Sequence, residues 1–483
     1  MTRAILAIDQ GTTNSKAVLV SDSGEILSRG SAPVGIDHPH PGWVEQDPLR
    51  IWASVQEAIA ECLAGAKVDI LGIAISNQRE SVTVWDADTG APLGAVVSWQ
   101  CRRTAPVCAE LTAAGHAPRV QELTGLPIDP MFPGPKMRWL LDRVPAGRKV
   151  RLGTIDAWLI HCLTGGVVHA CDASNAARSQ LYDLNRQVWS DELCALFGVD
   201  KSCLPSVRDS ASVFGVTHGV AGLPNGIPIA AAIGDSHAAL FGHGAFNSGD
   251  GKVTFGTGSS IMTTLPQFIA PQQGITTTIA WTLNGTPTYA FEGNILVSAS
   301  ALPWMVAMLG LADVQALTDL AATAEPNGPG FVPAFVGLGA PHWQADARAL
   351  FCGITFNTTR AQMARAVTDS MAFQVHDVFA AMSAQSPAPL GRLYADGGPS
   401  KNTFLMQCVA DTLNHPVIQC DAPEVSALGA AYLAGLSLGV WADLAAIAAL
   451  PRGRKEIEPQ PADRHARLAV WEDAIKRSTL PGG

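Results

Sequence analysis

The feature that most constrains the fold is a pattern that occurs twice in the sequence. A short β-rich run, a turn of Gly, Thr and Ser, and a second β-rich run form residues 5–20, ILAIDQGTTNSKAVLV, and again residues 252–264, KVTFGTGSSIMTT. Glycine lets the backbone turn tightly, and small hydroxylated residues leave successive N–H groups exposed on one concave side, an arrangement that binds anions. A duplicated hairpin with two such turns predicts two similar domains that face one nucleotide.

The first turn carries charged residues that fit a phosphate site. Asp9, at the end of the first strand, would repel a bare phosphate, so its position makes sense only with a cation between them, and Mg²⁺ is the expected one. Lys16 is placed to reach a terminal phosphate as a point charge. The alternative is an ordinary hairpin with a Gly-Thr turn, because short glycine motifs often occur by chance. The second copy of the pattern favours the phosphate site.

Length and composition restrict the class of protein. A chain of 483 residues with 47% hydrophobic and 15% charged residues predicts two well-cored domains, which we place at residues 1–244 and 245–483. The net charge of −10 argues against nucleic acid or an anionic membrane as a partner. The ten cysteines form no C-x-x-C pair, which favours reduced thiols. With no signal peptide and no apolar run long enough to cross a bilayer, we expect a cytoplasmic protein.

Two strand ends in the first half carry side chains suited to hydroxyl recognition and proton transfer. A buried strand at residues 68–76 is followed by Arg79 and Glu80, whose fork of donors and carboxylate would grip hydroxyls unless they form only a solvated turn. Trp99 follows another strand, and its ring would form one wall of a sugar or polyol site or else only pack against neighbouring side chains. Asp235 comes between a strand at residues 228–233 and a helix. It would act as a base towards an alcohol, or merely cap the helix.

The remaining periodicity predicts mainly core elements. Helices are expected at about residues 152–163 with Thr154 as the cap, at residues 296–309 and 361–382, and from about Ser400. The strand before that last helix ends in Asp-Gly-Gly, where the backbone can approach a flat ring or a phosphate closely. His237 and His243 lack a carboxylate cluster and are interpreted as structural. The tail after residue 450 receives no assignment.

The two hairpins and the Asp-Gly-Gly segment together resemble the actin-like ATPase fold. Within that fold the chain resembles the FGGY family of carbohydrate kinases, among which it is most similar to the glycerol kinases. The motifs that carry the resemblance are DQGTT at residues 9–13, NQRE at 77–80, WQCRR at 99–103, GTG at 256–258, GLGAPHW at 337–343, and the run of residues 396–407. They cover nearly the whole chain in the family's order. The resemblance implies an α/β chain of two actin-like (ribonuclease H-like) domains with a nucleotide cleft between them.

The resemblance also implies a reaction and roles for individual residues. The reaction is transfer of the γ-phosphoryl group of ATP to a terminal hydroxyl of a small polyol or sugar, with Mg²⁺ as cofactor, in a possible homodimer or homotetramer. Asp235 matches the family's general base, and both Asp9 and Asp235 are placed at the metal. The acceptor contacts carried over are Arg79, Glu80, Trp99, Met131, Asp235, Ser236 and Ser260. The nucleotide contacts carried over are Thr12, Thr13, Asn14, Lys16, Gly256, Thr257, Gly258, Gly398 and Asn402.

Several positions depart from the glycerol kinase pattern. Met131 replaces a tyrosine, Ser236 a glutamine and Ser260 a phenylalanine, so the acceptor site loses aromatic surface and gains hydroxyls. We therefore expect a four- or five-carbon polyol or ketose as acceptor in preference to glycerol. Ala299 and Pro303 also differ, on the adenosine side. The competing hypotheses are a nucleotide-driven scaffold or chaperone on the same fold, and a catalytically silent binding or regulatory protein. The presence of both Asp9 and Asp235 argues against a silent protein.

Overall fold

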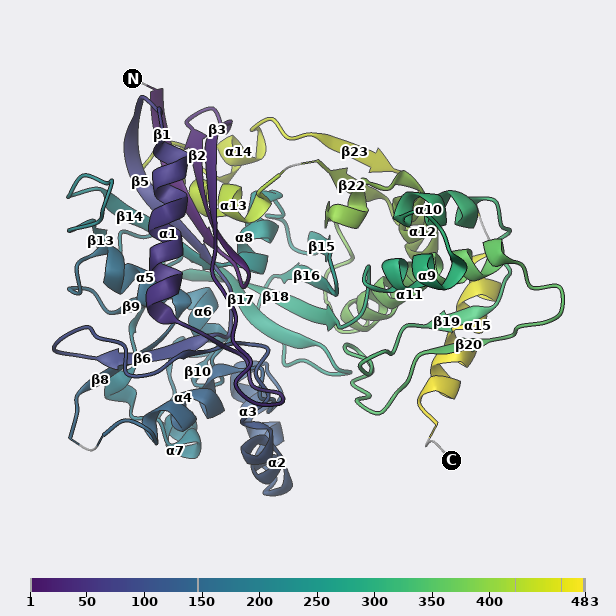
Figure 1. Cartoon of the computed structure of the whole chain (residues 1–483), viewed down its shortest axis with the longest axis horizontal. Coiled ribbons are helices and arrows are strands. Elements are labelled where there is room, and N and C mark those ends of the chain that lie inside the picture. The colour runs from purple at the N-terminus through teal and green to yellow at the C-terminus, as the bar shows by residue number, and fades with distance from the viewer. Residues whose placement is uncertain (1, 146, 422, 462, 481–483) are drawn as a thin grey trace. The chain divides into compact units, whose positions relative to one another are not determined.

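The computed structural model of the chain describes residues 2–145, 147–421, 423–461 and 463–480 and divides into two compact units. Unit 1 comprises Met1–Phe246, Thr277–Ala290 and Glu424–Pro451, and unit 2 comprises Asn247–Thr276, Phe291–Pro423 and Arg452–Gly483. Both units mix helices and strands (Figure 1). The chain is therefore an α/β protein in which each unit is assembled from separate stretches of sequence.

Unit 1 is built around a six-stranded sheet with the order β13-β14-β5-β1-β2-β3. The strands in the first part of unit 1, including those outside this sheet, are β1 (Thr2–Gln10), β2 (Asn14–Ser21), β3 (Ile26–Pro33), β4 (Glu45–Gln46), β5 (Val68–Asn77), β6 (Val82–Asp86), β7 (Val96–Val97), β8 (Val150–Thr154), β9 (Ala170–Asp172), β10 (Tyr182–Asp183), β11 (Val188–Trp189), β12 (Ser206–Arg208), β13 (Gly215–Val216) and β14 (Pro228–Gly234). Its helices are α1 (Pro48–Leu63), α2 (Ala105–Ala113), α3 (Ala117–Thr124), α4 (Pro133–Leu141), α5 (Ile155–Leu163), α6 (Ala173–Ala177), α7 (Asp191–Phe197), the 3₁₀ turn Lys201–Cys203, α8 (Asp235–Gly242), α13 (Val425–Ser437) and α14 (Leu444–Ala448).

The central strands of unit 1 form its core. β1 pairs antiparallel with β2 and parallel with β5, and β5 pairs parallel with β14, so the carboxyl ends of β1, β5 and β14 meet at one edge. Residues 4–8 of β1 are all buried, as expected for a strand covered on both faces. Helix α1 lies along β2 and β3 (Figure 1), and it packs so closely at Gly30 that an added Cβ would approach the Ala58 carbonyl oxygen to 2.1 Å. The edge where the three strands end is where ligands bind in such sheets.

Unit 2 repeats the same hairpin-plus-parallel-strand arrangement. Its sheet has the order β17-β18-β16-β15-β21-β22-β23, and β15 pairs antiparallel with β16 and parallel with β21. The strands of this sheet and of the rest of unit 2 are β15 (Gly251–Phe255), β16 (Ser259–Leu265), β17 (Thr276–Leu283), β18 (Thr286–Ile295), β19 (Gly330–Val332), β20 (Leu350–Cys352), β21 (Leu393–Gly397), β22 (Val417–Cys420) and β23 (Arg454–Ile457). Nearly all of β17 and the first half of β18 fall in the Thr277–Ala290 stretch that is grouped with unit 1. The helices are α9 (Ala301–Leu309), α10 (Val314–Ala322), α11 (Arg360–Ser383), the 3₁₀ turn Gly398–Lys401, α12 (Thr403–Leu413) and α15 (Arg464–Ser478).

Three predicted helices begin later than expected, each for a local reason. The first residues of the helix predicted at 152–163 form β8, which pairs with β6. Thr154 is the N-cap residue of α5, as predicted, but its hydroxyl donates to Asp156 instead of making a capping bond. The helix predicted from residue 296 begins at Ala301, because the N–H groups of residues 298–300 bond to carbonyls of the second Gly/Thr turn. The helix predicted from Ser400 follows a 3₁₀ turn and starts at Thr403, capped by Asn402.

The tail after residue 450, for which the sequence predicts no element, contains a strand and a helix. β23 pairs antiparallel with β22, and α15 buries Trp471 against Phe373 of α11, with ring centroids 5.5 Å apart. In the described part of the chain, no single helix has the length and hydropathy needed to cross a membrane. Only α9 and α10 taken together pass that test, and they are bent by 81° at the break between them.

Candidate active site

The first Gly/Thr turn closes the hairpin of β1 and β2 at the ligand edge of unit 1. Gln10 pairs with Ser15 across the hairpin, and the Gly11 N–H donates to the Asn14 carbonyl at 2.9 Å. Thr13 and Asn14 are exposed, whereas Thr12 is half-buried. The Trp99 indole N–H donates to the Thr12 hydroxyl at 2.9 Å, so the structure brings the predicted acceptor wall directly beside the predicted phosphate loop.

Asp9 and Lys16 face each other across the same hairpin. Asp9 accepts a hydrogen bond from the Ser76 hydroxyl at 2.7 Å, and Lys16 forms an ion pair with Glu424 at 2.7 Å. The pKa of Asp9 is raised to about 6, chiefly by burial and also by the Asp235 and Glu424 carboxylates, against the lowering effects of Ser76 and Lys16. A carboxylate destabilised in this way gains from a cation placed next to it.

Asp235 lies at the carboxyl end of β14, next to β5. Gly234 and Asn77 are paired in register, and Arg79 Nε is 3.3 Å from Asp235 Oδ1. An added Cβ at Gly234 would come within 2.7 Å of the Arg79 side chain, so glycine is needed where that side chain crosses the strand end. Gly234 is the cap residue of α8, and Asp235 is the first residue of the helix, with 40% of its side chain exposed. Because Gly234 occupies the cap position, Asp235 is not the N-cap residue that the alternative interpretation of the sequence predicts.

Glu80, a predicted acceptor contact, is almost fully buried. It has a left-handed backbone, with φ of 59°, and its carboxylate accepts from Arg178 Nε at 2.6 Å. Lys136 is also buried, and its ammonium donates to the carbonyls of Glu80 at 3.1 Å and Met131 at 2.6 Å. Two basic side chains that the sequence analysis missed therefore hold predicted acceptor contacts, Arg178 the side chain of Glu80 and Lys136 the backbone of Glu80 and Met131.

Burial lowers the pKa of Lys136 to about 7, below the 10.5 of an exposed lysine. Between these two pH values the Lys136 side chain binds more protons in the unfolded chain than in the folded chain, so its contribution to the free energy of unfolding is expected to rise with pH from 7 to 10.5, by an amount on the order of a few kcal/mol. Lys136→Met should abolish this rise in urea titrations, whereas Lys201→Met, at an exposed lysine, should keep it. Equal slopes for the parent and Lys136→Met would contradict the assignment.

Asp9 and Asp235 fit the requirements of a magnesium ion. They lie close enough for the Asp235 charge to raise the pKa of Asp9, and both offer the oxygen ligands that Mg²⁺ prefers. Within the described residues no group of three or more His, Cys, Asp and Glu side chains could hold a metal by itself. Magnesium commonly uses one or two carboxylates, with waters and phosphates as the other ligands, so this pair is sufficient.

The site residues predicted in the second half all lie in unit 2. Gly256–Gly258 form the turn between β15 and β16, and the Thr257 carbonyl accepts from Ser298 N–H at 2.8 Å and from the Ser300 hydroxyl at 2.9 Å. A Cβ at Gly258 would lie 2.3 Å from the Ile295 carbonyl oxygen, which requires glycine there. Ser260 is half-buried on β16, opposite Thr254.

Gly398 and Asn402 line a pocket of about 440 Å³ in unit 2. Ala299 and Pro303, the two positions that depart from the family pattern on the adenosine side, line the same pocket. Asn402 donates to the Thr318 hydroxyl at 2.9 Å and accepts from Leu405 N–H at 3.0 Å. The structure thus brings together the predicted adenosine-side residues, with the asparagine side chain held by its neighbours.

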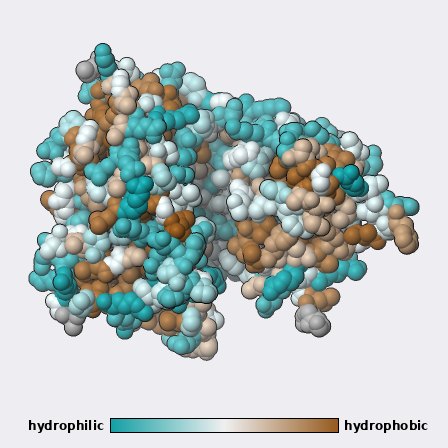
Figure 2. All heavy atoms as spheres, in the orientation of Figure 1, coloured by the Kyte–Doolittle hydropathy of each residue, from teal (hydrophilic) through white to brown (hydrophobic). Residues whose placement is uncertain are grey.

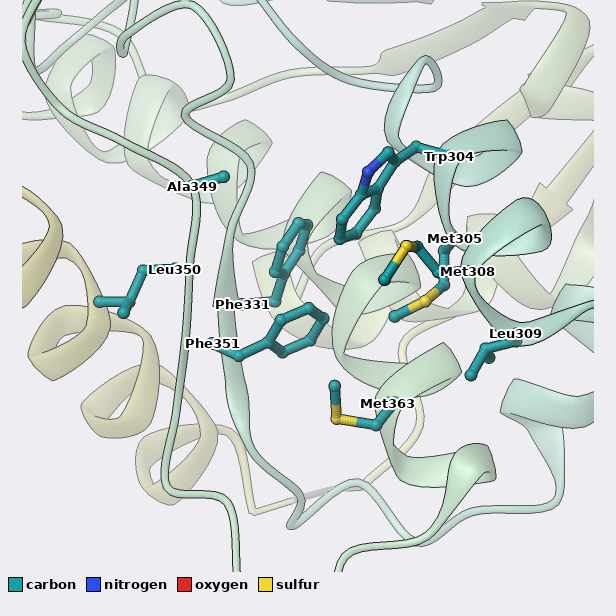
Figure 3. A pocket seen from close by; sticks show the side chains of 9 residues that line it. All are labelled: Trp304, Met305, Met308, Leu309, Phe331, Ala349, Leu350, Phe351 and Met363. Carbon is teal, nitrogen blue, oxygen red and sulfur yellow. The ribbon is translucent and has the colours of Figure 1, made fainter.

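A second pocket of unit 2, of about 390 Å³, is almost entirely apolar (Figure 3). Phe331 and Phe351 lie side by side with centroids 4.3 Å apart, and Trp304 stacks on Phe331 at 5.8 Å. Figure 2 shows apolar side chains on the face of unit 2 that carries α9 and α10, where Met308 is 66% exposed. Apart from the Trp304 indole, the pocket offers no side-chain nitrogen or oxygen, so it lacks the polar groups needed to orient a sugar or a phosphate.

Comparisons with known proteins identify the class. Residues 4–242 match the N-terminal domain of the FGGY family of carbohydrate kinases, and residues 251–438 match its C-terminal domain. The chain belongs to the FGGY family of carbohydrate kinases. It therefore has the actin-like ATPase fold and transfers a phosphoryl group from ATP to a hydroxyl of a sugar or polyol.

Individual relatives are similar over their full lengths. The chain is 46% identical to an apulose kinase of Pectobacterium atrosepticum, with 99% of each chain covered, and 44% identical to a glycerol kinase of Symbiobacterium thermophilum, with 98% of each covered. Among solved structures, Plasmodium falciparum glycerol kinase with ADP matches with a TM-score of 0.95 and 31% identity, covering 100% of this chain and 99% of that one. Nothing in these comparisons supports a catalytically silent binding protein.

Proposed function

We propose that this kinase phosphorylates a terminal hydroxyl of a four- or five-carbon polyol or ketose, with Mg·ATP as donor and Asp235 as general base. The observation that carries the proposal is the arrangement at one edge of unit 1. There Asp235 pairs with Arg79 at 3.3 Å, and Trp99 is hydrogen-bonded to the phosphate loop at Thr12. Groups suited to hydroxyl binding, proton removal and phosphate binding are thus found within one unit.

The proposed step balances as a direct transfer. Asp235 accepts the proton of the acceptor hydroxyl, that oxygen forms a bond to the γ-phosphorus, and the bond from phosphorus to the bridging oxygen breaks to leave ADP. Arg79 and Glu80 orient the acceptor hydroxyls, and Trp99 packs against its carbon skeleton. Lys16 and the N–H groups of residues 12–14 hold the phosphates, and Asp9 with Asp235 would hold Mg²⁺, which supplies charge neutralisation when bound.

Unit 2 is proposed to bind the other parts of the nucleotide and one part of the acceptor. The turn Gly256–Gly258 has the backbone shape of a second phosphate loop, and the pocket with Gly398 and Asn402 would take the adenosine half. Ser260 would contact the acceptor. Each assignment combines the position of the residue with the family motif in which it lies.

The choice of acceptor rests on the small and flexible residues of the site. Met131 stands where glycerol kinases carry a tyrosine, and its backbone is fixed by Asp129 and Lys136 while its side chain is only half-buried. Ser236 adds a hydroxyl directly after Asp235. A relative at 46% identity phosphorylates apulose, a five-carbon ketose, which supports an acceptor larger than glycerol.

An acceptor panel tests the proposal. Purified protein with Mg·ATP is assayed for ADP release with glycerol, erythritol, the pentitols, apulose, xylulose and ribulose. Hexoses are included as acceptors that are larger than the proposed C4–C5 compounds. We expect one C4–C5 compound to give a kcat/KM at least about tenfold above that of glycerol, the effect of roughly 1.4 kcal/mol of transition-state binding. A value for glycerol above every C4–C5 compound would overturn the acceptor assignment and leave the kinase assignment intact.

A further inference from the structure

A seven-residue segment of unit 1, residues 172–178, contacts three parts of the proposed site at once. It comprises the last residue of β9, the short helix α6 and Arg178, and every residue in it is buried. None of its side chains lies among the predicted acceptor or nucleotide contacts. Its hydrogen bonds lead instead to the backbone and side chains that carry those contacts.

Ser174 holds the end of the strand that precedes Asp235. Its hydroxyl oxygen accepts from the Gly234 N–H at 3.0 Å and donates its proton to Asp172 Oδ1 at 2.9 Å. Because a hydroxyl has one proton and Asp172 receives it, the serine oxygen is left as an acceptor for Gly234. Asp172 therefore determines the direction of the hydrogen bond between the Gly234 N–H and the Ser174 hydroxyl.

Asn175 holds the end of the neighbouring strand. Its amide forms a reciprocal pair with the amide of Asn77, with N···O distances of 3.0 and 2.9 Å. Its second amide proton goes to Asp172 Oδ1 at 2.8 Å, which fixes which end of the amide faces Asn77. Asn77 ends β5, two residues before Arg79.

Asp172 organises both contacts. Its carboxylate also accepts from the N–H groups of Ser174 and Asn175, each at 2.9 Å, and from the Ser210 hydroxyl at 2.7 Å. A fully buried carboxylate with this many donors has one orientation available, and so do the side chains bound to it. Gly234 and Asn77 are paired in register, so adjacent residues of α6 hold adjacent strand ends.

We infer that Ser174 and Asn175, oriented by Asp172, are positioning residues that fix Asp235 relative to Arg79. Through Gly234 and Asn77 they set the spacing of the general base and the acceptor-binding guanidinium. This inference rests on the proposed function, because it assumes that Asp235 is the base. Displacements of a fraction of an ångström between a catalytic group and its substrate lower the rate. The hydrogen bonds of Ser174 and Asn175 to the ends of β14 and β5 are therefore expected to affect the chemical step.

A matched pair of variants tests the inference in the full-length chain. Ser174→Ala removes one donated and one accepted hydrogen bond at the carboxyl end of β14. Thr217→Val removes the same two kinds of bond at the other end, where the buried Thr217 hydroxyl donates to the Pro224 carbonyl at 2.7 Å and accepts from Ile227 N–H at 3.0 Å. Both variants should lower Tm. A difference in kcat between them therefore reflects which end of β14 has lost its hydrogen bonds, and not the loss of stability.

We expect Ser174→Ala to lower kcat by at least about tenfold while KM for Mg·ATP and for the acceptor changes by less than about threefold. Apulose and glycerol are the two probe acceptors, and the faster is used. Thr217→Val should keep kcat within about twofold of the parent. Asn175→Ala, which acts on the strand end before Arg79, should instead raise the acceptor KM. Hydrogen exchange of the peptide of residues 228–242, which needs no acceptor, should be faster at Gly234 in Ser174→Ala.

The outcomes separate this inference from the proposed function. An equal fall in kcat for Ser174→Ala and Thr217→Val, or unchanged exchange at Gly234, would overturn the positioning role. Faster exchange at Gly234 together with a parental kcat would overturn it as well. Retained activity in Asp235→Asn would instead refute the base on which the inference depends. If neither probe acceptor is phosphorylated by the parent, the exchange result decides alone.

Discussion

Asp235→Asn is expected to lower kcat by about a thousandfold, within the range of 10²–10⁴ typical for loss of a general base. Asparagine keeps the shape of the side chain beside Arg79 but accepts no proton. The measurement is steady-state ADP release with the best acceptor of the panel, together with calorimetric binding of Mg·ATP. Nucleotide binding should fall far less than kcat, because the phosphate loop and Asp9, the other carboxylate proposed to hold Mg²⁺, are unchanged.

The control for this prediction is Asp191→Asn. Asp191 is a highly exposed carboxylate of the same unit, paired with Lys201 at 2.8 Å, and lies in the first turn of α7. Its removal should leave kcat unchanged. A kcat for Asp235→Asn within about tenfold of the parent would show that the proton leaves by another route, since loss of a base costs more than that.

Arg178→Met is expected to destabilise the protein by about 3–5 kcal/mol, because it leaves the buried Glu80 carboxylate without its cation. Arg178 and Glu80 are both almost fully buried and are joined at 2.6 Å, and the guanidinium also lies 5.2 Å from the Phe132 ring centroid. The free energy of unfolding is measured by urea titration. Because Glu80 is a predicted acceptor contact, the acceptor KM should rise in the fraction that remains folded.

An exposed ion pair of the same unit supplies the control. Arg119 contacts Glu192 at 2.8 Å, and about half of each side chain is exposed. Surface pairs contribute little to stability, so Arg119→Met should leave the urea midpoint unchanged. Equal destabilisation by the two variants would mean that the Glu80 carboxylate does not need Arg178.

Local sequence patterns were sufficient to predict the strands and turns of the site. Asp9, Arg79 and Asp235 each follow a run that reads as a buried strand, and parallel strands bring their carboxyl ends to one edge. The structure places these three residues together at that edge, as the family resemblance implied. Their catalytic and binding roles stay predictions until the variants are measured.

The supporting residues were not predictable because their partners are far away in the sequence. Glu80 and Arg178 are 98 positions apart, and Lys16 and Glu424 are 408 positions apart. Lys136 lies in a helix whose periodicity gives no hint that its ammonium is buried and donates to the carbonyls of Glu80 and Met131. From the sequence alone no role is predicted for Asp172, Ser174 and Asn175, because a polar side chain shows its function only once its partners are known.

The composition of unit 1 has a consequence for how the protein is made. Helix α13 packs on β1, β5, β14 and α8 and begins directly after Glu424, the partner of Lys16 in the phosphate loop. An added Cβ at Gly429 of that helix would lie 1.8 Å from the Ala238 carbonyl oxygen, so the two helices meet at their backbones. During translation, the part of unit 1 that is synthesised first must therefore remain with part of its core uncovered until the ribosome has also synthesised residues 424–451.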